Sequence, residues 1–215
     1  EQGHHKWKTT EGCIIFPEGK SWKDYVRDIR LEITCGEAPY LISRYDTTTG
    51  ETIPLEQRIG LLDRKLRVVS ENTSTSGEWL EWAQEAYKST YGYEWQGDNL
   101  LIARESMLVS FVEYFQQKFG KCPLLKSINY IAYIISWNVW QMDGLRGVIP
   151  NSCGERREVV ADLFGTREEV SQCEGCQKDD IRRHNGIYCQ IKDWRAKDPK
   201  TGKMGKRIRF IDLIK

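Results

Sequence analysis

The stretch that decides the fold is residues 29–41, Ile-Arg-Leu-Glu-Ile-Thr-Cys-Gly-Glu-Ala-Pro-Tyr-Leu. Apolar and charged residues alternate from residue 29 to residue 34, which predicts a β-strand. The strand ends in small residues around Gly36, where a main chain without a side chain can approach a charged ligand closely. A helix that begins after such a turn offers free N–H groups to a carboxylate. The stretch therefore predicts a ligand site at the carboxyl end of a strand.

Predicted strands and helices alternate through the following hundred residues. Apolar spacing predicts a short helix around Trp22 and further helices over 55–69, 78–88, 99–119 and 124–135, whereas the aromatic segments 91–95 and 137–141 predict strands. This alternation predicts an α/β domain with a parallel sheet over residues 1–150, with a helical insertion at about 46–90. The more polar residues 151–215 are predicted to form a C-terminal module that ends in a strand over 208–214.

Two later strand ends carry acidic side chains. Glu94 ends the second predicted strand, where a carboxylate can accept hydrogen bonds from both hydroxyls of a ribose, and Trp95 can lie against an adenine ring. Asp143 follows the third predicted strand and can accept a hydrogen bond from an exocyclic amine, while Gly144 permits the turn. Ligands of open α/β sheets bind outside the carboxyl ends of the strands. The three loops together predict a pocket for an adenosine that carries an amino-acid tail.

In this order the three motifs resemble those of the adenine-specific DNA methyltransferases of restriction–modification systems. The first motif of that family runs Leu-Glu-Pro-Ala-Cys-Gly-Ser-Gly-Gly-Phe-Leu. The residues of this chain that match the three motifs are Leu31, Glu32, Cys35, Gly36 and Leu41 for the first, with Tyr40 in place of Phe, then Glu94, Asp98, Asn99, Ala103 and Arg104 for the second, and Met142-Asp143-Gly144-Leu145 for the third. The resemblance covers about residues 20–215.

The resemblance implies a Rossmann-like domain that binds S-adenosylmethionine, double-stranded DNA as substrate and methyl transfer to adenine N6, alone or with another restriction–modification subunit. The implied cofactor-binding residues are Glu32, Cys35, Gly36, Glu37, Tyr40, Glu94, Trp95, Asp143 and Gly144. The chain departs from the family at Ile33, Ala38 and Pro39, and it contains no Pro-Pro pair with which to match the Asn-Pro-Pro-Tyr catalytic motif. No catalytic residue is therefore assigned.

Three functions follow as alternatives. The first is an active adenine methyltransferase, and the second is a non-catalytic DNA-binding or specificity module built on the same fold. The third is an endonuclease, for which the sequence offers no convincing pair of metal-binding carboxylates, since Asp63 and Glu81 fall on predicted helix faces.

Thiol and imidazole side chains cluster near the C-terminus. Cys173, Cys176, His184 and Cys189 follow the spacing C-x2-C-x7-H-x4-C, and Gly175 and Gly186 supply turns beside them. Four such ligands suit tetrahedral Zn²⁺, and a closed set of four is typical of structural sites. The sequence predicts a structural zinc site, with reduced thiols of no special function as the alternative.

Composition and charge limit the classes of protein to which this chain can belong. The net charge is +1, but residues 192–206 are rich in Lys and Arg, which is compatible with phosphate contacts or with an ordinary solvated surface. No apolar run approaches the roughly 18 residues of a membrane span, so no membrane association is expected. Seven Cys without an apolar signal segment predict reduced thiols in a cytoplasm. The chain begins without Met, which is typical of a piece of a longer protein.

Overall fold

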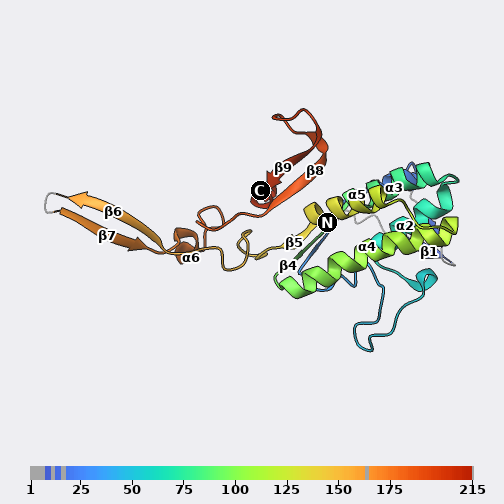
Figure 1. The fold of residues 1–215 in the computed structure, drawn as a ribbon, viewed down its shortest axis with the longest axis horizontal. Helices are drawn as coiled ribbons and strands as arrows, with labels where there is room; N and C mark the ends of the chain where they lie inside the picture. Colours follow the sequence, from blue (N-terminus) through green and yellow to red (C-terminus); the bar gives the residue numbers. More distant parts are fainter. Residues whose placement is uncertain (1–7, 11–12, 16–17, 163–164, 215) are drawn as a thin grey trace.

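The computed structural model describes residues 8–10, 13–15, 18–162 and 165–214 (Figure 1). Helices and strands follow one another in this order: β1 (Lys8–Thr10), β2 (Cys13–Ile15), α1 (Trp22–Arg27), β3 (Arg30–Ile33), α2 (Leu61–Asn72), α3 (Ser76–Lys88), β4 (Thr90–Glu94), α4 (Gly97–Phe119), α5 (Leu125–Asn138), β5 (Val139–Gln141), β6 (Arg156–Asp162), β7 (Gly165–Ser171), α6 (Glu174–Lys178), β8 (Gln190–Lys197) and β9 (Met204–Arg209). Two 3-10 segments, Leu55–Gln57 and Phe210–Leu213, complete the set.

A three-stranded parallel sheet lies at the centre, in the order β3-β4-β5. Its register pairs Ile33 with Tyr93 and Tyr93 with Trp140. Helices α2 and α3 connect the first two strands, and α4 and α5 connect the second to the third. The other described strands form antiparallel pairs, β1–β2, β6–β7 and β8–β9. The prediction of a mixed α/β fold with a parallel sheet is confirmed at this level.

Local sequence signals set most helix ends. Ser21 and Asp24 form a capping box at the start of α1, and the Thr75 hydroxyl accepts a hydrogen bond from Glu78 N at the start of α3. Gly120 ends α4 in the left-handed conformation, with φ of 65°. The end of α4 agrees with the predicted helix over 99–119, whereas α3 and α4 each begin two residues before the predicted starts at 78 and 99.

Three further predicted boundaries are wrong. The helix predicted from residue 55 begins at Leu61, because Leu55–Gln57 form a separate 3-10 turn. The strand predicted from residue 137 begins at Val139, because α5 continues through Asn138, whose buried amide donates hydrogen bonds to the main-chain oxygens of Tyr87 and Thr90. The strand predicted over 208–214 ends at Arg209, where the chain turns into the second 3-10 segment.

Two apolar clusters hold the described residues together. The larger cluster lies among α2, α3, α4 and α5, where fully buried Trp79 meets Phe111 and Phe115 at ring-centroid distances of 5.7 and 5.4 Å. In the smaller cluster, Tyr93 of the sheet packs edge-on against Phe210 at 4.9 Å, beside Ile191 of β8. The hairpin β8–β9 thus packs against the sheet across the boundary that the sequence predicts near residue 150.

The β6–β7 hairpin projects away from the helical body, as Figure 1 shows. None of the helices in the described part of the chain is both long and apolar enough to cross a membrane.

Candidate metal centre and strand-end cleft

Four side chains meet between the projecting hairpin and the sheet. They are Cys153, Cys173, Cys176 and His184, and their ligand atoms all lie within 4.8 Å of one another. Each of the three sulfur atoms lies 3.6 Å from His184 Nδ1. Tetrahedral zinc, with Zn–S of about 2.3 Å and Zn–N of about 2.0–2.1 Å, places sulfur and nitrogen about 3.5–3.6 Å apart. The cluster can therefore hold a metal ion such as zinc.

Two glycines allow the main chain to close around this cluster. A Cβ atom on Gly175 would lie 2.6 Å from His184 N and 2.7 Å from its Nδ1. A Cβ atom on Gly186 would lie 2.8 Å from Cys153 Sγ. The His184 main-chain N–H donates to the Tyr188 hydroxyl at 2.8 Å, which fixes the loop that carries the imidazole. The turns predicted at both glycines lie against the ligands themselves.

Hydrogen bonding favours the thiolate at Cys173. Burial opposes ionisation, but main-chain N–H groups of Asn185 and Cys176 and the His184 side chain lower the pKa of Cys173 to about 6. The Asn185 N–H lies 3.3 Å from the sulfur. Burial and the two neighbouring thiols raise the pKa of Cys153 to about 11. A bound divalent cation deprotonates the thiols that coordinate it, so it would stabilise the thiolate form of all three cysteines.

The predicted ligand Cys189 does not belong to the cluster. Its thiol donates to Gln141 O at 3.3 Å and packs in the smaller apolar cluster, where burial raises its pKa to about 12. Hydrogen bonds from Cys189 N to Gly147 O and from Phe210 N to Cys189 O hold it beside the sheet. The fourth ligand position is occupied by Cys153, so the zinc-type set predicted from spacing is corrected at that one residue.

Strand pairing explains why Cys153 takes this place. Val148 bridges Tyr188 in antiparallel fashion, and Ile149 N donates to Ile187 O. The segment that leads to Cys153 therefore runs alongside the segment that follows His184. The C-x2-C spacing contains no signal of this pairing, because Cys153 lies far upstream of Cys173.

The three strand-end motifs also meet, at the carboxyl edge of the parallel sheet. Gly36 N donates to Glu94 Oε2 at 2.7 Å, and Met142 N donates to Glu94 O at 2.9 Å. A Cβ atom on Gly144 would lie 3.3 Å from Ile33 Cγ2, so the loop after β5 reaches the end of β3. The sequence predicted this convergence.

A cleft of about 370 Å³ opens beside the first of these loops. Five predicted cofactor-binding residues line it, together with residues that the prediction of the site omitted. The lining comprises Glu32, Cys35, Gly36, Glu37 and Tyr40, with Thr34, Pro39, Thr47 and Asn99. Asn99, from the start of α4, belongs to the second motif, and Thr47 lies in the loop between β3 and the 3-10 segment Leu55–Gln57.

The loop that forms this cleft has an unusual main chain. Thr34, Gly36 and Ala38 have φ values of 59°, 56° and 63°. The left-handed region is unfavourable for Thr and Ala, and such strain concentrates at ligand sites.

Glu32 is the unsatisfied acid in this cleft. Its Oε2 atom is buried and has no hydrogen-bond partner among the described residues. Burial raises the pKa of its carboxyl to about 7, because the charged form lacks compensating partners. A cationic ligand group beside this oxygen would satisfy it.

The remaining predicted cofactor residues have visible structural roles or stand apart. The Glu94 carboxylate accepts from Gly36 N and Gln96 N, and the Asp143 carboxylate accepts from Leu145 N and Arg146 N. Trp95 is 41% exposed, and neither it nor either acid lines the cleft.

Within the cleft, two of the first-motif side chains make structural contacts. Glu37 Oε2 accepts from the Tyr45 hydroxyl at 2.5 Å. The buried Cys35 sulfur would lie 3.1 Å from a Cβ on Gly92, so it packs closely against β4. Tyr40 is 74% exposed at the mouth and free to cover a ligand.

Searches of known protein families, of curated proteins and of solved structures found no match to this chain.

Proposed function

We propose that this chain is the S-adenosylmethionine-binding part of a DNA adenine-N6 methyltransferase. The observation that carries the proposal is the meeting of Gly36, Glu94 and the Gly144 loop at one edge of the sheet, beside a cleft lined by the first motif. The order β3-β4-β5, with consecutive strands adjacent, is that of one half of a doubly wound, Rossmann-like sheet. Such sheets bind nucleotides at this edge.

The chemistry of the cleft matches the charge of the cofactor. S-adenosylmethionine carries an ammonium and a sulfonium group, both cationic, and its bound form would supply the methyl group. Glu32 offers an unpartnered carboxylate oxygen to the ammonium, and the left-handed loop at Gly36 lets main-chain groups approach closely. Tyr40 can cover the ligand from the mouth of the cleft. Target-base chemistry is assigned to no residue here, and another subunit can supply it.

Isothermal titration with S-adenosylmethionine tests the proposal. We expect one site per chain, competed by S-adenosylhomocysteine. Glu32→Gln should weaken binding by about tenfold or more, since a charge-assisted hydrogen bond contributes about 1.5–3 kcal/mol. The matched control Glu71→Gln, on the exposed side of α2, should leave affinity unchanged. Absence of binding to the wild-type chain would refute the proposal.

A second candidate is a non-catalytic DNA-binding module on the same fold. It is favoured by the Glu94 carboxylate, whose two oxygens each accept a main-chain hydrogen bond and which is buried and outside the cleft lining. On this alternative the chain binds duplex DNA but neither binds nor uses the cofactor. An assay with methyl-labelled cofactor, with and without candidate partner subunits, separates the two functions.

We also propose that the Cys153, Cys173, Cys176 and His184 cluster holds a structural zinc ion. Four protein ligands leave no open position for a substrate, as is typical of structural rather than catalytic zinc. The ion would fix the base of the β6–β7 hairpin to the segment that precedes it. Its removal should therefore loosen this part of the chain and leave the helical core folded.

A further inference from the structure

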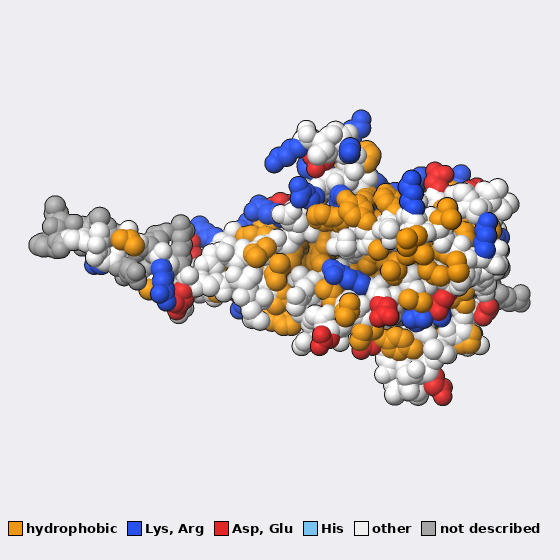
Figure 2. Space-filling model, in the orientation of Figure 1, with side chains coloured by type: hydrophobic (Ala, Val, Ile, Leu, Met, Phe, Trp, Pro, Cys, Tyr) orange, Lys and Arg blue, Asp and Glu red, His pale blue; other side chains and the backbone are white. Residues whose placement is uncertain are grey.

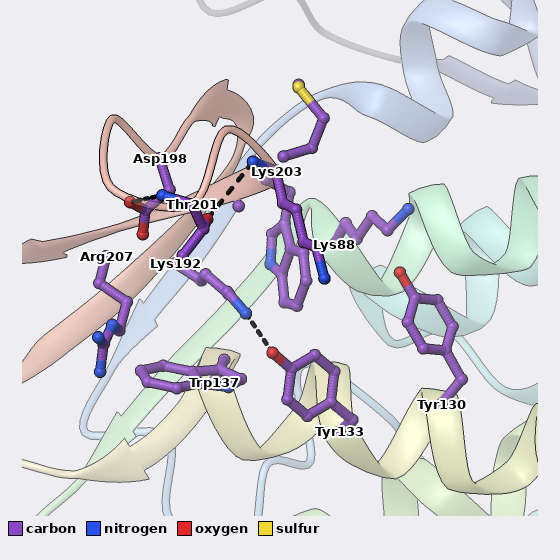
Figure 3. Close-up of a pocket in the computed structure, with 12 residues that line it drawn as sticks. Lys88, Tyr130, Tyr133, Trp137, Lys192, Asp198, Thr201, Lys203 and Arg207 are labelled. Carbon is purple, nitrogen blue, oxygen red and sulfur yellow. Dashed lines mark hydrogen bonds between the residues drawn. The ribbon is translucent and has the colours of Figure 1, made fainter.

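A second hollow, the aromatic–basic groove, lies between α5 and the β8–β9 hairpin (Figure 3). Its volume is about 450 Å³, within the range of pockets that take small ligands or parts of larger ones. Lys88, at the end of α3, borders it and lies just before β4 begins. The groove is therefore at the amino end of the parallel sheet, opposite the strand-end cleft.

One wall of the groove is a row of aromatic rings on α5. Tyr130, Tyr133 and Trp137 are spaced three and four residues apart and so share a face of the helix. The rings of Tyr130 and Tyr133 are stacked, with centroids 6.3 Å apart and an interplanar angle of 27°. Tyr133 is 44% exposed. The Tyr133 ring already contacts Tyr130 and the Lys192 ammonium, so a flat ligand would stack on it by displacing the Lys192 side chain.

The opposite wall supplies cations without carboxylate partners. The Lys192 ammonium lies 4.5 Å from the ring centre of Tyr133 and 5.0 Å from those of Trp137 and Trp194, and it donates to the Tyr133 hydroxyl. Lys192, Lys203 and Arg207 form no ion pair with any acid in the described ranges. Their charge is therefore available to an anion.

The single acid of the groove does not cancel this charge. The Asp198 carboxylate accepts hydrogen bonds from the main-chain N–H groups of Lys200 and Thr201, which hold it within the hairpin turn. Residues 190–209 contain eight Lys or Arg and two Asp. Figure 2 shows Lys and Arg side chains gathered on this hairpin at the top of the view. The surface around the groove is strongly positive although the whole chain is nearly neutral.

Cations beside exposed rings match the chemistry of an unpaired nucleic-acid strand. Phosphates are recognised by Lys and Arg, and unpaired bases stack on aromatic side chains. Duplex DNA presents phosphates but keeps its base faces covered, so it would leave the rings unused. An acidic peptide lacks the flat aromatic groups that the Tyr133 face fits. We propose that the aromatic–basic groove binds a single-stranded stretch of DNA, with phosphates at Lys203 and Arg207 and a base on Tyr133.

The choice of DNA over RNA rests on the proposed function, whereas the preference for an unpaired strand rests on the groove alone. Since the groove and the strand-end cleft are at opposite ends of the sheet, the bound strand would lie away from the cofactor. The groove would anchor displaced or flanking DNA rather than the base that is modified.

Fluorescence anisotropy tests this proposal. The labelled probes are oligonucleotides of about 16 nucleotides: single-stranded DNA, the matching duplex and the matching RNA. We expect wild-type protein to bind single-stranded DNA at least tenfold more tightly than duplex. The double variant Lys203→Glu, Arg207→Glu should weaken binding to single-stranded DNA by about 10- to 100-fold. The slope of log affinity against log salt concentration should fall by about 1.4, since each lost phosphate contact accounts for about 0.7. Lys121→Glu with Lys126→Glu, outside the groove, is the matched control and should have little effect.

Tyr133→Leu separates stacking from charge. It should weaken binding to single-stranded DNA by about tenfold and leave the salt slope unchanged, because no cation is removed. Equal or tighter binding of duplex, a tenfold preference for RNA, or equal effects of the groove and control variants would each overturn the proposal. Titration of the same variants with S-adenosylmethionine keeps the two proposals apart, since groove variants should bind the cofactor normally whether or not they bind DNA.

Discussion

Replacing Cys153 by Ser is the sharpest test of the metal centre. The structure places Cys153 Sγ 3.6 Å from His184 Nδ1, at the same distance as the other two sulfurs, and places Cys189 in an apolar cluster instead. Apparent zinc binding in four-ligand structural sites contributes about 10–16 kcal/mol. Shared equally among four ligands, this is about 2.5–4 kcal/mol for one thiolate, or about two to three orders of magnitude in Kd.

The assay is competition of purified protein against a zinc-binding dye, together with metal content by mass spectrometry. Wild-type protein should hold one zinc ion. Cys153→Ser should bind zinc about 100- to 1,000-fold more weakly, so that a competitor with a correspondingly lower affinity for zinc removes the ion. Cys189→Ser should keep wild-type affinity. Its hydroxyl can still donate to Gln141 O, so only a modest loss of stability is expected, of about 1 kcal/mol. Loss of zinc from Cys189→Ser with retention in Cys153→Ser would refute the reasoning.

Two other variants test how the main chain and the cleft are built. Gly175→Ala should lose zinc affinity, because the new Cβ would lie 2.6 Å from His184 N. The control Gly77→Ala has open space around the new Cβ and should be neutral or slightly stabilising. Metal content and thermal unfolding measure both variants. The Glu32 carboxyl, with its pKa raised to about 7, stabilises the folded state fully below about pH 4.5 and loses this contribution as pH rises through 7. Glu32→Gln should remove this pH dependence of stability. At pH 8 it should stabilise the unliganded chain by about 1–2 kcal/mol, a value that allows for a carboxyl that is only half buried. Urea unfolding at pH 5 and pH 8 measures the difference, and an identical pH dependence in the variant would show that Glu32 is not the group responsible.

The sequence predictions that were confirmed depend on interactions between residues close together in the chain. Capping groups and the left-handed Gly120 act within a few residues, so the starts of α1 and α3 and the end of α4 are marked by nearby residues alone. The alternation of residues 29–34 likewise marked β3, and the order of strands and helices was enough to predict a parallel sheet. Predictions failed where a distant partner decides the conformation. Asn138 remains helical because its amide bonds to Tyr87 and Thr90, which adjoin it only in the folded chain.

The sequence alone determined the mixed α/β class with a parallel sheet, three of the four residues of the candidate metal cluster and the strand-end loops, since each depends on spacing between near neighbours. Only the tertiary structure decided the fourth ligand, because strand pairing through Val148 and Tyr188 brings Cys153 to His184 while Cys189 turns into the apolar cluster. It also decided the aromatic–basic groove, whose rings come from α5 and whose cations come mainly from a hairpin more than fifty residues later. Contacts of that kind are formed by packing, and no periodicity along the chain records them.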